Sequence, residues 1–233
     1  MVLLAIDTAG PDCAVAVATA GDGGTRILAG ETERIGRGHS EIIMPMIARV
    51  LLAAGCGYSD IGRVAVTVGP GSFTGIRAGI ATARGLALAL DIPAVGIGVL
   101  DALLEAALAG GAPGAVIAAL DARRGQIFAA GVNRATGDPL FQPLADDPNR
   151  VGALIRATVG AGPVCLTGSG GTLLAAALRR EGMEAEVVDA AESADIAAVA
   201  MLGGRAAPSK PPSPLYMRGA DAKVQTGKAV ARQ

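Results

Sequence analysis

Hydrophobic positions along the first half of the chain alternate between short β-branched runs and longer segments with helical spacing. The apolar runs predict three strands, then a strand between two helices, then a final strand and helix. The expected strands are residues 2–8, 13–19, 26–32, 63–68 and 94–97, and the expected helices are about 40–54, 74–90 and 100–108. The resulting order is β-β-β-α-β-α-β-α, in which three antiparallel strands are followed by βα crossovers.

The second half of the chain repeats this pattern in a shorter form. Two apolar runs predict a hairpin around residues 122–125, and residues 133–150, which are polar and contain proline, are predicted as a loop. Further strands are expected at 115–121, 126–132, 164–167 and 186–188, and helices at 173–181 and 193–203. The order predicts an α/β protein with the ribonuclease-H-like plan of actin, sugar kinases and Hsp70 ATPases. We expect a first domain at 1–100 with a return helix at about 193–207, a reduced second domain at 101–190 and a basic tail at 208–233.

Composition narrows the range of functions. The chain has 233 residues, 51% of them hydrophobic and 2% aromatic, so its core must consist of small aliphatic side chains. The formal net charge of −1 gives no overall basic footprint for nucleic acid. Three widely spaced cysteines (Cys13, Cys56 and Cys165) predict neither a disulfide framework nor a metal site. We see no basic leader and no membrane span, and expect a cytoplasmic protein.

The turn at residues 69–75 joins an apolar strand to a long helix, an arrangement that can point backbone N–H groups at a phosphate. Gly69, Gly71 and Ser72 are therefore candidate nucleotide contacts. The specific motifs are absent, because no lysine follows the glycines and their spacing is not that of a dinucleotide fingerprint. In the alternative interpretation, proline and glycine make a tight turn and Ser72 or Thr74 caps the helix.

Five motifs in the chain match one known family in order. They are Leu4-Ala5-Ile6-Asp7-Thr8, Gly38-His39-Ser40-Glu41, the nine residues 69–77, Asp121-Ala122-Arg123 and Pro214-Leu215-Tyr216-Met217-Arg218. On these residues the chain resembles the TsaB family, also called YeaZ, of the Gcp-like ASKHA superfamily. The family is the bacterial partner protein for making threonylcarbamoyladenosine in tRNA. The resemblance implies a two-domain actin-like/Hsp70 ATPase fold.

The resemblance also implies which residues would face a nucleotide or a metal. Asp7 and Thr8 correspond to the first phosphate loop, and Gly168 and Gly170 to the glycine-rich adenosine loop. No cofactor is firmly implied, although ATP or ADP is compatible with the interface of the complex. The catalytic homologue, TsaD, binds its metal through a His-x-x-x-His pair. Val99 and Leu103 occupy those two positions here, which predicts a non-catalytic subunit without a metal.

The two helices at 40–54 and 74–90 carry apolar residues on more than one face, which is compatible with an interface. In the family these helices contact TsaD, or a second copy as a homodimer when TsaD is absent. The ATPase TsaE joins the assembly, and tRNA is bound through the complex. The expected interface residues are His39, Ile43, Met46, Ile47, Val50, Ala78, Ala81, Thr82 and Gly85. A charged residue at Ile47 or Ala83 is expected to abolish partner binding without unfolding.

Other functions remain open. A stand-alone ATP-binding enzyme of the sugar-kinase type would use Asp7 and the two glycine loops. A peptidase would need His39 as its base, but the adjacent Ser40 is poorly placed to be activated by it. We instead expect His39 to fix the start of the helix or an interface. Cationic residues outnumber Asp221 from Arg205 onward, which predicts a solvated end or a weak polyanion contact.

Overall fold

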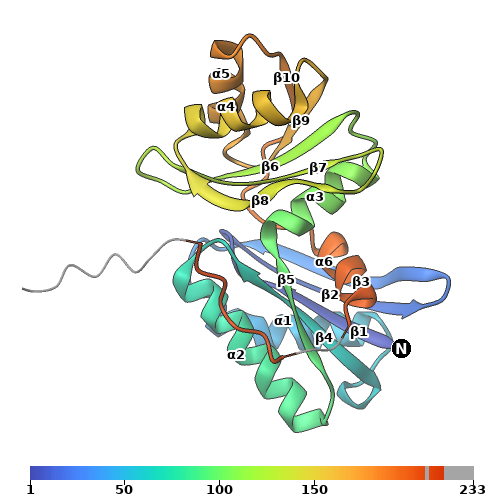
Figure 1. The fold of residues 1–233 in the computed structure, drawn as a ribbon. Helices are drawn as coiled ribbons and strands as arrows, with labels where there is room; N and C mark the ends of the chain where they lie inside the picture. The colour runs from blue at the N-terminus through green and yellow to red at the C-terminus, as the bar shows by residue number, and fades with distance from the viewer. Residues whose placement is uncertain (208–209, 218–233) are drawn as a thin grey trace, which may run out of the picture.

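Two five-stranded mixed sheets form the framework of the computed structural model, which describes residues 1–207 and 210–217 (Figure 1). In the first sheet the strand order is β3-β2-β1-β4-β5, with β1 antiparallel to β2 and parallel to β4. Its strands are β1 (Val2–Asp7), β2 (Asp12–Gly21), β3 (Gly24–Arg34), β4 (Ile61–Gly69) and β5 (Ala94–Gly98). Every described residue of β1 after Val2 is buried, as expected of a central strand.

Helices cover both faces of this sheet. The helices α1 (His39–Ala53) and α2 (Phe73–Leu90) contact one another and pack on one face. The short 3-10 turn η1 (Tyr58–Asp60) lies between α1 and β4 in the chain. The opposite face carries α6 (Ile196–Arg205). Neighbouring β4 residues point to opposite faces of the sheet: Val66 lies under Gly79 of α2, and Ala65 lies under Gly203 of α6. A Cβ atom at Gly203 would lie 2.4 Å from that of Ala65, so glycine permits this close helix–sheet approach.

The second sheet has the strand order β10-β9-β6-β7-β8. Its strands are β6 (Ala115–Asp121), β7 (Ile127–Asn133), β8 (Pro139–Asp146), β9 (Val164–Thr167) and β10 (Ala185–Asp189). The helices α4 (Pro148–Val159) and α5 (Gly171–Arg180) cover its outer face, and α3 (Val99–Ala109) lies between the two sheets (Figure 1). Apart from η1, β8 and α4, the predicted element order is confirmed, as is the hairpin at 122–125.

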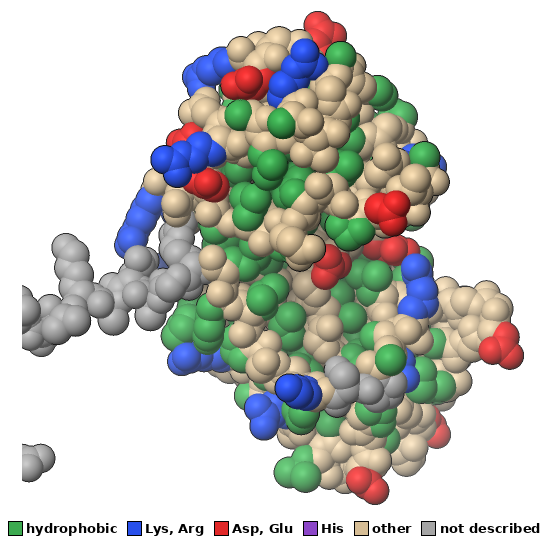
Figure 2. Space-filling model, in the orientation of Figure 1, with side chains coloured by type: hydrophobic (Ala, Val, Ile, Leu, Met, Phe, Trp, Pro, Cys, Tyr) green, Lys and Arg blue, Asp and Glu red, His purple; other side chains and the backbone are tan. Residues whose placement is uncertain are grey.

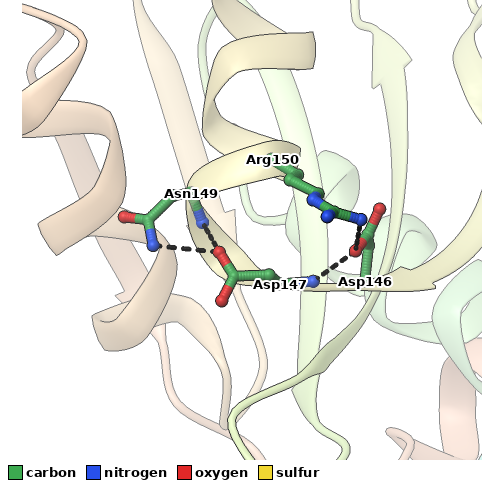
Figure 3. Close-up of polar contacts among 4 residues, drawn as sticks. All are labelled: Asp146, Asp147, Asn149 and Arg150. Atoms are coloured by element: carbon green, nitrogen blue, oxygen red, sulfur yellow. Dashed lines mark hydrogen bonds and ion pairs between the residues drawn. The ribbon is translucent and has the colours of Figure 1, made fainter.

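The prediction of a loop over residues 133–150 is wrong, because this stretch forms β8 and the start of α4 (Figure 3). Asp147 caps α4 by accepting hydrogen bonds from the backbone and side-chain nitrogens of Asn149 at 2.8 and 2.9 Å. Pro148 follows at the first helical position, where its missing N–H costs nothing. Asp146 accepts a hydrogen bond from the Asp147 amide and lies 3.6 Å from Arg150. The cap and the proline are the local pattern that predicts this helix.

The end of α6 and the segment beyond it are attached to the first sheet. Arg63 of β4 donates hydrogen bonds through Nη1 to the carbonyls of Gly203, Gly204 and Ala206, at 2.9, 3.3 and 2.8 Å. The amide of Leu215 donates to the carbonyl of Val68 at 2.8 Å. Most of residues 210–217 are exposed, as expected of a solvated end, but the hydrogen bond of Leu215 attaches this segment to β4. Residues 208–209 and 218–233 lie outside the described residues.

No helix within residues 1–207 and 210–217 is both long enough and apolar enough to cross a membrane.

Candidate functional site

A cleft of about 550 Å³ lies where the two halves of the chain meet. From the first half it is bordered by the loop after β1 and by the turn before α2. From the second half it is bordered by the β6–β7 hairpin and by the loop after β9. Its lining residues include Ala9, Gly10, Pro70, Gly71, Ser72, Val99, Asp121, Arg123, Ser169 and Glu192. It combines charged side chains of both signs with small apolar ones.

The glycine turn at 69–75 packs tightly against the end of β1. The amide of Ser72 donates a hydrogen bond to the carbonyl of Ala9 at 2.7 Å, and a Cβ atom at Gly71 would lie 2.2 Å from that oxygen. The Ser72 hydroxyl caps α2 by accepting from the amide of Gly75 at 3.3 Å. Gly69 has a φ of 117°, in the region that favours glycine. These contacts support the interpretation of a tight turn with a helix cap.

Asp7 and Thr8, the predicted phosphate-loop residues, are not among the residues that line this cleft. Both side chains are fully buried. One Asp7 carboxylate oxygen, Oδ1, accepts hydrogen bonds from the Thr67 hydroxyl at 2.6 Å and the Ala9 amide at 3.0 Å, while Oδ2 has no partner. Burial raises the pKa of the Asp7 carboxyl above its ordinary value, and the hydrogen bond from Thr67 opposes that shift. The Thr8 hydroxyl is occupied as a donor to the carbonyl of Gly75 at 2.7 Å.

The second glycine loop reaches the cleft through Ser169 rather than through its glycines. Gly168 and Gly170 are buried against β6, where the Gly170 amide donates to the Ala119 carbonyl at 2.9 Å. The Ser169 hydroxyl accepts a hydrogen bond from the Asp121 amide at 3.2 Å and borders the cleft. Of the nucleotide contacts predicted from the sequence, only Gly71 and Ser72 border the space between the two halves.

His39 holds the loop after β1 and is not placed at a partner surface. Its side chain is 5% exposed, and its Nε2 lies 3.1 Å from the Gly10 carbonyl and 3.2 Å from the Asp12 carbonyl. Since both neighbours are acceptors, Nε2 must carry the proton and act as the donor. The same loop contacts the segment before α6, where the Asp12 amide donates to the Ser193 hydroxyl at 3.3 Å. This geometry supports the expectation that His39 fixes the start of α1.

The two positions that correspond to a metal-binding histidine pair are apolar and buried. Val99 begins α3 at the edge of the cleft, and Leu103 lies one turn later on the same helix. Neither side chain has a donor atom for a metal. Within residues 1–207 and 210–217, no group of three or more His, Cys, Asp or Glu side chains is placed to hold a metal ion.

The predicted interface residues divide into two sets. Ile43, Met46, Ile47 and Val50 are buried under the first sheet, as is Ala83 of α2, so they cannot contact a partner. This corrects the expectation that charged residues at Ile47 or Ala83 would leave the fold intact. Ala81 and Gly85 are exposed, and Ala78 and Thr82 are half-buried.

Two exposed leucines on these helices are not among the expected interface residues. Leu52 of α1 is 82% exposed and Leu88 of α2 is 86% exposed. Both could have been found by helical spacing, because Leu88 follows Ala81 by two turns and Leu52 follows Met44 by a little more than two. Six exposed residues of the two helices, all small or apolar, define what we call the α1–α2 face: Met44, Ala48, Leu52, Ala81, Gly85 and Leu88. Arg49 and Arg84 are also exposed on these helices.

The chain was compared with known proteins. The family model of TsaD, described as tRNA N6-adenosine threonylcarbamoyltransferase, matches residues 32–213. The chain is 38% identical over 128 residues to the tRNA threonylcarbamoyladenosine biosynthesis protein TsaB of Escherichia coli, a match that covers 55% of this chain and 53% of that protein. It is 32% identical over 128 residues to the Bacillus subtilis protein of the same name, with 55% and 53% coverage. These matches span about half the length of each relative.

Solved structures extend the similarity over nearly the whole chain. The structure described as YeaZ from Pseudomonas aeruginosa is 26% identical, with a TM-score of 0.73 over 92% of this chain and 99% of that one. A second, described as an uncharacterized protein with similarity to peptidase YEAZ from the same organism, is 27% identical, with a TM-score of 0.75 and 93% and 99% coverage. The resemblance to TsaB/YeaZ and the predicted fold class are therefore confirmed.

Proposed function

Because this chain belongs to the TsaD family of tRNA N6-adenosine threonylcarbamoyltransferase, we propose that it takes part in forming threonylcarbamoyladenosine in tRNA as a non-catalytic subunit. It would form a heterodimer with a catalytic TsaD protein in the cytoplasm, with the ATPase TsaE attached to the assembly. Its relatives named TsaB support the pathway. The catalytic site would then belong to the partner, and tRNA would be bound by the complex.

The start of α3 supports a non-catalytic role. Transfer by a metal-dependent homologue needs donor side chains one helical turn apart, so that both reach the same ion. Val99 and Leu103 offer hydrocarbon only, and both are packed in the core. The Nε2 atom of the lone histidine is engaged by two backbone carbonyls, and the ring is only 5% exposed, which disfavours its use as a general base.

The α1–α2 face is the surface on which we expect the protein partner to bind. Leu52 and Leu88 leave most of their side chains in water, on two helices that contact one another. Burying a leucine fully contributes about 1.5–3 kcal/mol, so two of them can anchor a partner. The small exposed residues Ala81 and Gly85 on α2 would let a partner helix approach closely. A second copy of this chain would use the same surface when TsaD is absent.

Sedimentation of this chain mixed with purified TsaD tests the proposal. We expect a heterocomplex with the wild type, and its loss with Leu52→Asp combined with Leu88→Asp. Leu173→Asp serves as the matched control, because this leucine is also exposed but lies on α5 over the second sheet. The proposal fails if no heterocomplex forms, or if the double variant binds TsaD as tightly as the control.

The cleft is also compatible with a second candidate function, that of a stand-alone ATP-binding enzyme of the sugar-kinase type. Its volume of about 550 Å³ and its position between two sheets favour a small ligand. The burial of Asp7 and Thr8 behind it argues against their direct use on phosphates. Calorimetry with ATP and Mg²⁺ separates the two functions. Tight binding by the isolated chain would favour the enzyme, and binding only in the presence of TsaD would place the nucleotide at the interface of the complex.

A further inference from the structure

An aromatic–arginine cluster lies at the start of α2, and we define it as Phe73, Arg77 and Tyr216. The ring centroids of Phe73 and Tyr216 are 5.6 Å apart, with 27° between the ring planes. The Arg77 guanidinium carbon lies 3.7 Å from the centre of the Phe73 ring. Arg77 Nε also donates a hydrogen bond to the Tyr216 hydroxyl at 3.1 Å. Each member of the cluster therefore restricts the other two.

Backbone contacts bring this cluster together from distant parts of the sequence. The segment 210–217 runs beside α2 toward its N-terminal end (Figure 1). The hydrogen bond from the Leu215 amide to the Val68 carbonyl fixes the residue next to Tyr216. A Cβ atom at Gly69 would lie 2.9 Å from the Leu215 carbonyl oxygen, so the segment lies directly on the turn before α2. The site is thus built by the fold and does not depend on a chance side-chain contact.

The cluster leaves a large aromatic surface in water. Phe73 is 55% exposed and Tyr216 is 50% exposed. The chain has only three phenylalanines, two tyrosines and no tryptophan, so two of its five aromatic residues are placed here. Within the described residues, about half of each ring is left uncovered by the fold. Exposed rings beside a guanidinium are the arrangement on which unpaired bases stack.

The helix that carries two members of the cluster is cationic. The helix α2 contains Arg77 and Arg84 and no acidic residue, and its capped N-terminus adds a partial positive charge. Figure 2 shows Lys and Arg side chains along the left rim of this face, with Asp and Glu side chains among them in the upper half. Beyond Met217 the sequence continues with four cationic residues, Arg218, Lys223, Lys228 and Arg232, and one acidic residue, Asp221.

The cleft next to the cluster is electrostatically mixed. Arg123 borders the cleft and lies 3.7 Å from the Asp121 carboxylate. Glu192, on the same cleft, is paired with Arg34. Each of these two acidic groups of the cleft thus has an arginine partner.

We propose that the aromatic–arginine cluster is a contact for single-stranded RNA, in which an unpaired base stacks on the exposed rings and Arg77 with the start of α2 receives the adjoining phosphate. This rests on the proposed function, because tRNA is the substrate that brings unpaired bases to the complex. Stacking is tolerant of base identity, so the contact would position RNA rather than read its sequence. A protein partner is the competing occupant, and charge favours RNA over it.

Fluorescence anisotropy with a labelled, unstructured RNA of roughly 15 nucleotides tests this contact on the full-length chain. We expect weak binding at low salt that weakens further as salt is added. The double variant Phe73→Ala with Tyr216→Ala should bind about tenfold more weakly, and Arg77→Gln should reduce the salt dependence. Tyr58→Ala is the control, because it removes an exposed ring from η1. Circular dichroism should show the same fold for all variants.

Two outcomes would overturn the proposal: no RNA binding by the wild type at low salt, or equal binding by the double variant and the control. Sedimentation of the same variants with TsaD separates this result from the proposed function. Loss of TsaD binding with RNA binding unchanged would assign the cluster to a protein partner. Loss of RNA binding in a chain that never binds TsaD would support the RNA contact while contradicting the heterodimer.

Discussion

The hydroxyl of Thr8 donates a hydrogen bond to the carbonyl of Gly75 at 2.7 Å, and this buried contact joins the end of β1 to the first turn of α2. The Thr8 carbonyl lies so close to Gly75 that a Cβ atom there would be 2.0 Å from the oxygen. A sequence motif that looks like a phosphate loop thus serves here to attach a helix to a strand.

Replacing Gly75 with alanine should unfold this junction, because neither backbone can move without breaking the attachment. We expect Gly75→Ala to lower the free energy of unfolding by about 3 kcal/mol in urea titrations. Gly85→Ala is the matched control in the same helix, since a Cβ atom there meets nothing within 4 Å. That variant should raise stability by about 0.5–1 kcal/mol. Equal effects of the two substitutions on stability would show that the close contact with the Thr8 carbonyl does not exclude a Cβ atom at position 75.

Asp7→Asn should change how stability depends on pH. Because burial raises the pKa of Asp7 in the folded state, that state holds the proton more tightly than the unfolded chain does. The stability associated with protonated Asp7 is therefore complete below the unfolded pKa, at about 4, and is lost as pH rises through the folded pKa. Asparagine stays neutral, so the stability of the variant relative to the wild type should increase as pH increases. Parallel unfolding curves for the two proteins between acid and neutral pH would contradict this prediction.

Ile47 and Leu52 should respond in opposite ways to aspartate. Ile47 is fully buried in the first core, so Ile47→Asp places a charge there and should lower stability by more than about 4 kcal/mol. Leu52→Asp changes a side chain that is almost entirely in water and should stay within about 0.5 kcal/mol of the wild type. Thermal melts followed by circular dichroism measure both. A folded Ile47→Asp chain would mean that α1 is turned differently on the sheet.

His39→Ala should loosen the loop that borders the cleft. The substitution leaves the carbonyls of Gly10 and Asp12 without their donor, which should lower stability by about 1–3 kcal/mol. His39→Gln keeps an N–H group and should recover part of this loss. Hydrogen exchange of residues 9–12 reports on the loop directly. If alanine and glutamine behave alike, the hydrogen bonds of His39 do not hold the loop.

Local pattern was sufficient for most of the element order. The β-branched run of β4, the glycine turn and the helical spacing of α2 follow each other within thirty residues, so their periods and turn residues predict them directly. The strand β8 looks like a loop in the sequence because it is an edge strand with prolines at 139 and 143 and without a fully buried residue. The start of α4 was predictable from Asp147 and Pro148, and was overlooked within a polar stretch.

The sequence by itself determined the order of strands and helices outside β8 and α4, and the tight turn before α2, because each of these depends on neighbouring residues only. Tertiary structure decided which apolar side chains of α1 face the sheet and which face water, since the helix is apolar on more than one side. It also decided that Asp7 is buried. The hydroxyl that binds its carboxylate comes from Thr67, sixty residues away in the sequence, and only the pairing of β1 with β4 brings the two together.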